Sequence, residues 1–216
     1  MPDFSVEQSI LEHAIDLLMP PCAGLIAGVD EAGRGPWAGP VVAAAVIFPD
    51  LKISKYLAEN LNDSKKISTS KRKHLFEKLY DSGAFIGVGQ ASVQEIDELN
   101  ILQATFLAMR RAIADLPVPP VYALVDGNRE PPEFPCPVRT LVKGDALSLS
   151  VAAASIVAKV TRDKIMADLA QQFPFYAWEK NAGYGTAAHE KGLRDYGICV
   201  HHRKSFEPIK KFLENG

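Results

Sequence analysis

Short runs of apolar residues, each bounded by glycine or proline, divide the chain into predicted strands. The first two, at residues 24–27 and 41–48, flank a glycine-rich connection. Runs of this length between turn-forming residues are typical of buried strands. Three further runs predict strands at residues 84–90, 121–127 and 138–142.

Apolar residues that recur every three or four positions predict helices around these strands. Such spacing places the apolar side chains on one face of a helix. The expected helices span residues 5–18, 69–81, 100–115, 148–173 and 187–196. Because a helix precedes the strand at 121–127, we expect that strand to lie parallel to one of the earlier strands.

The composition is that of an ordinary globular protein. The 216 residues, 47% of them hydrophobic and 23% charged, suit one large domain or a domain with an appendage. A net charge of −2 does not indicate a nucleic-acid binder, so any basic surface that binds nucleic acid must be a local patch. Cys22, Cys136 and Cys199 lack metal-ligand spacing, the N-terminus is polar, and no run is long enough to span a bilayer. We therefore expect a cytoplasmic protein that contacts no membrane.

Two adjacent carboxylates, Asp30 and Glu31, stand between the first two predicted strands. Successive side chains on a strand point to opposite faces, so both acids reach one site only if the backbone turns there. Gly33 and Gly35 leave the backbone bare on both sides of Arg34, and bare amides in a turn form an anion-binding concavity. The stretch suits a hard cation that meets a phosphate, although the acid pair alone fits a solvated hairpin turn equally well.

Two more acids follow later strands. Asp126 ends the strand at 121–127, where open sheets place ligands, and it equally suits a turn before Gly127. Asp145 follows the strand at 138–142. Two unit charges ~4 Å apart repel by about 4 kcal/mol at an effective dielectric near 20, so a cluster of ionised acids requires a cation. Oxygen ligands alone favour Mg²⁺ or Mn²⁺.

Several other polar residues have both a functional and a structural interpretation. We expect Ser64 and Lys65 to contact phosphate, whereas the charges at 71–73 fit a solvated helix face. Asp163 is a possible ligand, but an ion pair on a helix is the favoured interpretation. Tyr184 lies between two glycines, which suits an exposed ring that stacks on a nucleotide. The histidines near the C-terminus lack ligand spacing and fit surface or structural roles.

The string Asp-Glu-Ala-Gly-Arg-Gly-Pro at residues 30–36 closely resembles the signature of bacterial ribonuclease HII, a type 2 ribonuclease H. The resemblance extends from residue 24 to residue 206. It includes Asp-Ser-Lys-Lys at 63–66, Lys-Gly-Asp and the small-residue run at 143–155, Gly-Tyr-Gly-Thr at 183–186, and His-Arg-x-Ser-Phe at 202–206. Leu147 and Leu149 make the stretch at 143–155 more apolar than the family pattern.

The resemblance implies an α/β, ribonuclease H-like fold: a mixed central sheet flanked by helices, with a helical C-terminal part. Residues 1–216 would form a single type 2 ribonuclease H catalytic domain, with an N-terminal helix within 1–20 and the C-terminal part at about 174–216. By the same resemblance, two Mg²⁺ or Mn²⁺ ions are bound by Asp30, Glu31, Asp126 and Asp145. Substrate is contacted by Gly33, Arg34, Gly35, Ser64, Lys65, Lys143 and Tyr184.

The implied activity is endonucleolytic cleavage of RNA in RNA–DNA hybrids. It includes a cut on the 5′ side of a single ribonucleotide in duplex DNA, which leaves a 3′-hydroxyl and serves replication and repair. The protein would act as a monomer. Phe206, Ile209 and Phe212 in a basic tail would permit contact with a sliding clamp.

Three alternatives remain open. Another ribonuclease H-like nuclease, such as a Holliday-junction resolvase or an exonuclease, would not require a 2′-hydroxyl. A nonenzymatic nucleic-acid binder on the same scaffold predicts substituted acids, but all four positions are acidic here. A small-molecule phosphohydrolase would leave Tyr184 and the basic patch without a role.

Overall fold

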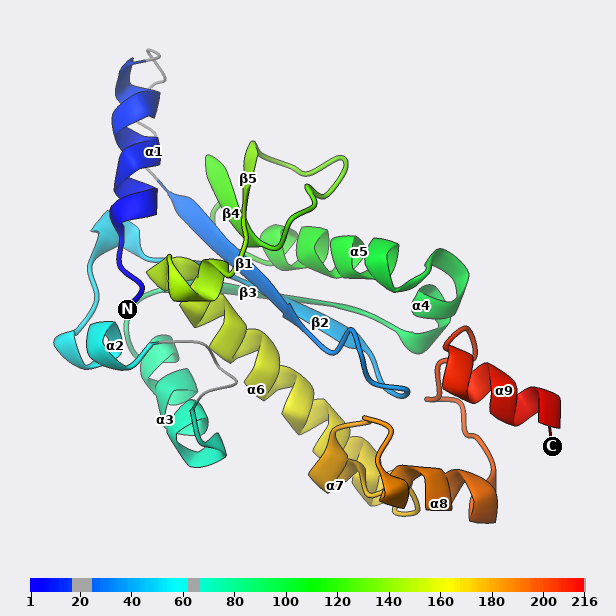
Figure 1. Ribbon diagram of the computed structural model, residues 1–216. Helices are drawn as coiled ribbons and strands as arrows, with labels where there is room; N and C mark the ends of the chain where they lie inside the picture. Colours follow the sequence, from blue (N-terminus) through cyan, green and yellow to red (C-terminus); the bar gives the residue numbers. More distant parts are fainter. Residues whose placement is uncertain (17–24, 62–66, 216) are drawn as a thin grey trace.

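The computed structural model of the protein describes residues 1–16, 25–61 and 67–215. Within these ranges a five-stranded sheet has the order β3-β2-β1-β4-β5 (Figure 1). The strands are β1 (Ile26–Ala32), β2 (Val41–Ile47), β3 (Phe85–Ala91), β4 (Tyr122–Asp126) and β5 (Val138–Leu141). The first three pair antiparallel, whereas β4 lies parallel to β1 and β5 lies parallel to β4. The predicted mixed sheet, with the fourth strand parallel to an earlier one, is confirmed.

Helices cover both faces of the sheet, with α5 on one face and α6 on the other (Figure 1). The helices before the C-terminal part are α1 (Ser5–Asp16), α2 (Lys55–Asn60), α3 (Thr69–Tyr80), α4 (Val93–Leu99), α5 (Ile101–Ala114) and α6 (Leu149–Gln172). Two short 3-10 turns, η1 (Pro49–Leu51) and η2 (Gly144–Ala146), complete this region. None of the helices in the described ranges is long and apolar enough to cross a membrane.

The two faces of the sheet carry separate apolar cores because strand residues alternate. On β2, Ala43 and Ala45 pack toward α5, while Ala44 and Val46 pack toward α6. The helices approach the strands closely where the strand has glycine. A Cβ on Gly28 would lie 2.1 Å from the backbone of Ser150, so the start of α6 rests directly on β1. The small-residue run in α6 thus has the packing role that its sequence predicts.

The C-terminal part is helical, as expected, and packs around the end of α6. Its helices are α7 (Trp178–Asn181), α8 (Ala187–Tyr196) and α9 (Glu207–Asn215). Their shared core includes Met166 of α6, the buried Trp178, and Ala38 from the connection between β1 and β2. This contact brings the C-terminal part against the segment that follows the paired acids.

Sequence periodicity misses some elements and misplaces one boundary. The strand predicted at 24–27 continues to Ala32, while residue 24 and the end of the helix predicted at 5–18 lie outside the described residues. Helices α2 and α7 have six and four residues, which is too short for a helical apolar repeat to be recognised. The α4 helix begins with a capping box between Ser92 and Glu95.

Candidate active site

Two of the predicted metal ligands, Asp30 and Asp126, lie side by side near the C-terminal ends of neighbouring parallel strands. Val29 of β1 is opposite Val125 of β4, so Asp30 and Asp126 are the next residues on the two strands. Asp126 in turn pairs with Leu141, the last residue of β5. Strand pairing alone therefore places these two carboxylates next to each other, at the edge of the sheet where β1 and β4 have their C-terminal ends.

Asp30 is the most buried of the four acids, with 6% of its surface exposed. Burial raises the pKa of its carboxyl well above the usual value, and the charges of Glu31 and Asp126 raise it further. Hydrogen bonds from the Glu31 amide, at 2.7 Å, and from the Ser155 hydroxyl favour the ionised form and only partly offset this effect. The acids are therefore close enough to disfavour simultaneous ionisation, which is the condition that a bound cation relieves.

The backbone does not turn at the paired acids, contrary to the condition set by their sequence. Because β1 continues to Ala32, Asp30 and Glu31 point to opposite faces of the sheet. Asp30 pairs with Ala44, on the α6 side, whereas Glu31 pairs with Ala43, on the α5 side. On that second side, a cavity of about 360 Å³ is lined by Glu31 and Asp126 together with Arg34, Asn128 and Arg129.

The fourth acid belongs to a turn that is tied to Asp126. The amide of Gly144 donates a hydrogen bond of 2.7 Å to Asp126 Oδ1. Lys143 adopts a left-handed conformation, with φ of 59°, and thereby starts the η2 turn that carries the partly buried Asp145. We refer to the carboxylates of Asp30, Glu31, Asp126 and Asp145 as the acid edge.

The acid edge is not a preformed metal cage. In the described part of the chain, no three His, Cys, Asp or Glu side chains come together closely enough to hold an ion. Magnesium is usually held by one or two carboxylates, several waters and the phosphates of a substrate. The all-oxygen donors and the raised pKa of Asp30 fit an ion of that kind, whose coordination is completed by substrate.

The connection between β1 and β2, residues 33–40, is here called the glycine loop, and a buried arginine organises it. Arg203 is fully buried and donates to the backbone carbonyls of Gly33 (2.6 Å), Arg34 (3.0 Å), Gly39 (2.9 Å) and Pro40 (3.2 Å). The ring of Phe206 covers its guanidinium at 4.9 Å. All three nitrogens of this guanidinium thus donate to the glycine loop.

A second buried arginine supports the same loop from α6. Arg162 donates to the carbonyls of Pro40 at 2.9 Å, Ala38 at 3.1 Å and Ala182 at 2.9 Å. Burial lowers the pKa of Arg162 to about 10 and that of Arg203 to about 9, so both remain charged at neutral pH. Arg162 also occupies the space beside Gly33, where a Cβ would lie 1.9 Å from its Nε.

The position of these carbonyls determines where the loop amides point. In a trans peptide the carbonyl and the following N–H point in opposite directions. Because the carbonyls of Gly33 and Arg34 face Arg203, the amides of Arg34 and Gly35 point away from it. Neither amide donates to another group in residues 1–16, 25–61 or 67–215. The glycine loop therefore presents two adjacent free N–H groups, with a buried cation behind them.

Tyr184 lies against this amide pair. A Cβ on Gly35 would be 3.4 Å from the Tyr184 ring, and 49% of the tyrosine surface is exposed. Its backbone is fixed by hydrogen bonds to Asn181 and from Thr186, and the carbonyl of the preceding Gly183 accepts from Trp37 at 2.8 Å. The structure thus brings together Gly33, Arg34, Gly35 and Tyr184, which are 150 residues apart in sequence.

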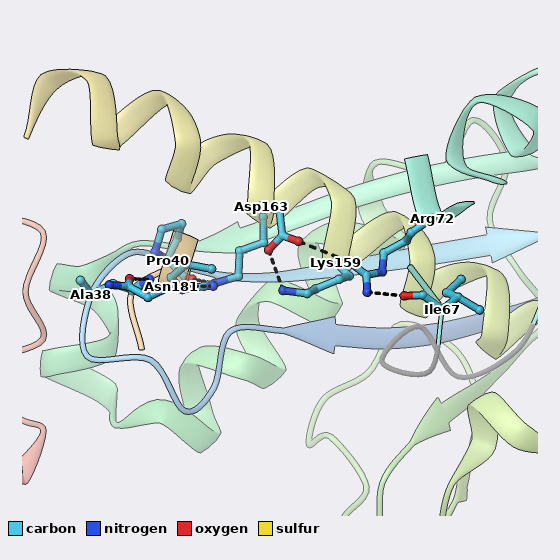
Figure 2. A network of polar contacts seen from close by, with 10 residues as sticks. Ala38, Pro40, Ile67, Arg72, Lys159, Asp163 and Asn181 are labelled. Carbon is cyan, nitrogen blue, oxygen red and sulfur yellow. Dashed lines mark hydrogen bonds and ion pairs between the residues drawn. The ribbon is translucent and has the colours of Figure 1, made fainter. Parts of the chain in front are cut away.

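Other predicted contacts have different outcomes. Ser64 and Lys65 lie outside the described residues. The prediction that Arg72 belongs to a solvated face is wrong, because it is buried and bonds the Ile67 carbonyl at 3.1 Å. Asp163 is ion-paired with Lys159 at 2.6 Å and with Arg72 at 3.7 Å, as its favoured interpretation predicted (Figure 2). It therefore braces α3 against α6 and does not join the acid edge.

Sequence reasoning missed the residues that support the site from behind. Arg203 lies in the His-Arg-x-Ser-Phe motif without an assigned role, and no motif singles out Arg162. Ser155 has no signal beyond the small-residue run that contains it. The two arginines bond only backbone carbonyls, so a side-chain pattern carries no trace of their partners.

Comparisons with known proteins agree on one family. A family model described as Ribonuclease HII matches residues 27–209. The ribonuclease HII of Paramagnetospirillum magneticum is 53% identical over 213 residues, which is 99% of each chain. Among solved structures, the ribonuclease H2 of Pyrococcus horikoshii OT3 is 29% identical with a TM-score of 0.73, over 88% of this chain and 98% of that one. The ribonuclease HII of Archaeoglobus fulgidus, solved in complex with PCNA, is 26% identical with a TM-score of 0.70, over 85% and 95%.

Proposed function

The chain belongs to the ribonuclease HII family, and on that premise we propose how its own residues divide the work of cutting ribonucleotides out of duplexes. As a ribonuclease H it is an endonuclease that hydrolyses the RNA strand of RNA–DNA hybrids. We assign the reaction to the acid edge and the recognition of ribose to the glycine loop with Tyr184. The observation that carries this assignment is the pair of outward amides beside an exposed tyrosine, at the end of the strand that bears Asp30 and Glu31.

The acid edge would hold two divalent ions, Mg²⁺ or Mn²⁺, through Asp30, Glu31, Asp126 and Asp145. Such ions activate an attacking water and stabilise the leaving oxygen of a phosphodiester. The chain contributes by fixing its ligands. One oxygen of Asp126 accepts a hydrogen bond from the Gly144 amide, and the other oxygen would be available to a metal ion. The cut falls on the 5′ side of the ribonucleotide, so the products carry a 3′-hydroxyl and a 5′-phosphate.

The glycine loop would recognise the ribose sugar of the substrate. The amides of Arg34 and Gly35 suit the 2′-oxygen and the adjoining phosphate, and the Tyr184 ring suits stacking on the neighbouring nucleotide. A hydrogen bond to one hydroxyl contributes only ~0.5–1.5 kcal/mol, about tenfold at best. Strict dependence on ribose therefore requires that recognition also position the scissile phosphate, because a displacement of ~1 Å can cost ~100-fold in rate.

Contacts farther from the reaction complete the proposal. Lys143, exposed at the start of the turn that carries Asp145, would hold the substrate backbone, as would Ser64 and Lys65. We propose one catalytic domain over residues 1–216, acting as a monomer in the cytoplasm. Arg72, Lys71 and Lys73 are given no substrate contact, because the first is buried and the others extend to solvent.

A contact between the C-terminal tail and a sliding clamp remains part of the proposal. Its support is that the ribonuclease HII of Archaeoglobus fulgidus was solved with PCNA. Of the tail residues predicted to serve, Ile209 is fully buried and Phe206 covers Arg203. Phe212 is partly buried, and the neighbouring Leu213 is 46% exposed, so a clamp would have to engage the end of α9.

The function is tested by incubating the protein and Mg²⁺ with a labelled DNA duplex that contains one ribonucleotide. We expect a single cut on the 5′ side of that ribonucleotide and no cut in the all-DNA duplex. Cleavage of the all-DNA duplex would instead support a ribonuclease H-like nuclease that does not require a 2′-hydroxyl. Binding without cleavage would support a nonenzymatic role.

A further inference from the structure

Two buried histidines of the C-terminal part face each other behind the Tyr184 turn. His189 comes from α8 and His202 from the segment that follows it, and their Nε2 atoms are 3.0 Å apart. Both are at most 1% exposed. The rings of Trp37, Tyr176 and Trp178 surround them. A pair of imidazoles in such an apolar setting needs defined hydrogen-bond partners.

The surrounding donors allow one arrangement of protons with both rings neutral. The Cys199 amide donates to His202 Nδ1 at 2.9 Å, so the proton of His202 is on Nε2. The Trp178 indole donates to His189 Nε2 at 3.3 Å, so that nitrogen is bare and also accepts from His202. The proton of His189 is therefore on Nδ1, and it is donated to the Tyr184 carbonyl at 3.0 Å.

We propose that His189 is a positioning residue for cleavage, which holds Tyr184 at the glycine loop through its Nδ1–H. His202 and Trp178 keep His189 in the tautomer that can donate. The proposal rests on the role of Tyr184 given above. The same carbonyl also accepts from the Thr186 amide at 2.9 Å, so the two donors fix the peptide plane from which the exposed ring extends.

We call the hydrogen bonds that run from His202 and Trp178 through His189 to the Tyr184 carbonyl the relay. Different substitutions of His189 can separate its two ends. In His189→Gln, the amide oxygen suits the former Nε2 position and accepts from Trp178 and His202, but the donor to Tyr184 is lost. In His189→Asn, the amide nitrogen suits the former Nδ1 position and retains that donor. His201→Gln is the matched control, because His201 is the adjacent, half-buried histidine outside the relay.

The measurement is kcat and KM on the duplex with one ribonucleotide, with thermal unfolding as the check on folding. We expect His189→Gln to lower kcat about tenfold with little change in KM, which corresponds to the loss of one hydrogen bond. His189→Asn should recover part of that loss even if it unfolds at a lower temperature. Equal kcat for Asn and Gln, or a loss that follows only the melting temperature, would overturn the proposal.

A double-mutant cycle with Tyr184→Ala tests whether the effect passes through the tyrosine. In the Tyr184→Ala background we expect His189→Gln to have almost no further effect on kcat. An unchanged tenfold effect in that background would mean that His189 acts elsewhere, and a normal rate for Tyr184→Ala alone would also overturn the proposal. Wild-type cleavage of the duplex, measured in the same series, tests the proposed function separately.

Imidazole nitrogen NMR tests the relay without any activity. We expect His189 as the Nδ1–H tautomer and His202 as the Nε2–H tautomer at neutral pH. A His189 proton on Nε2 would contradict the proposal, because the donor to Tyr184 would then be absent.

Discussion

The acid edge and the glycine loop are adjacent, yet they are built on opposite principles. The acid edge concentrates negative charge, which raises the pKa of Asp30, and the described residues form no metal cage there. The glycine loop is held rigid from behind, by two buried arginines on its own carbonyls, and the relay holds Tyr184 beside it. Metal and substrate can complete the first region, because ions adjust their remaining ligands. The second must discriminate a single hydroxyl, so its geometry has to exist beforehand.

The largest effect is expected from Asp126→Asn, which weakens the acid edge without touching the glycine loop. Removing a charged ligand should cost several kcal/mol of transition-state stabilisation, about a thousandfold in rate. The melting temperature without metal should rise, because the charge beside Asp30 is gone. The measurements are single-turnover cleavage and metal-free thermal unfolding, with the exposed Asp168→Asn as control. Near-normal cleavage would remove Asp126 from the proposed ligands.

Arg203→Lys breaks the rigidity of the other region while it keeps the positive charge. A lysine has no planar fork, so it cannot serve four carbonyls at once. We expect cleavage to fall about 100-fold, and stability to fall by about 3 kcal/mol through unsatisfied carbonyls. Arg194→Lys, at an exposed position of α8, is the control. If cleavage per folded molecule is unchanged, the glycine loop does not depend on its support.

Two glycines of the loop sharpen the comparison further. Gly33 has φ of 97°, and a Cβ there would meet Arg162, so Gly33→Ala should destabilise the protein by about 2 kcal/mol and lower cleavage at least tenfold. Gly35→Ala should change stability by less than about 0.5 kcal/mol, because its Cβ would only touch the Tyr184 ring. Chemical denaturation of both variants decides the order. A more damaging Gly35→Ala would contradict the described loop conformation.

Most of the sheet could be predicted from sequence, because buried strands give uninterrupted apolar runs between turn residues. The positions of Asp30 and Asp126 followed from the same runs, once β4 was expected to be parallel. The opposite orientation of Glu31 was not predictable, since the end of β1 depends on its pairing with β2. The support of the glycine loop was equally hidden. Arg203 bonds backbone carbonyls, which every residue has, and His189 and His202 bond backbone groups and each other. Such partners leave no pattern in the sequence.

Acid is expected to act on stability through the relay, and not on the rate of cleavage at neutral pH. Burial lowers the pKa of His202 to about 4, with further lowering by His189, and His189 also has a lowered pKa. The ionisable groups around the pair are Tyr176, Glu190, Cys199 and His201. The unfolded chain binds protons more readily below pH ~6.5, so stability should fall from that pH toward 4 by about 3 kcal/mol for His202.

The check is the pH dependence of unfolding in wild type and in His202→Asn. The asparagine oxygen suits the Nδ1 position and can still accept from the Cys199 amide. The variant should lose most of the slope between pH 6.5 and 4. An equal slope in both proteins would mean that His202 titrates alike in the folded and the unfolded state. The pH dependence of stability would then have another cause.

The central claim is that ribose is recognised through the position of Tyr184 and is expressed in the rate of cleavage. The direct measurement is the affinity and single-turnover rate of Tyr184→Ala and Tyr184→Phe on duplexes with one ribonucleotide and with none. Our account predicts that Tyr184→Ala slows cleavage far more than it weakens binding, and that Tyr184→Phe retains more activity because the ring remains. If Tyr184→Ala changes only affinity, or leaves cleavage intact, the tyrosine is a surface aromatic and the account is contradicted.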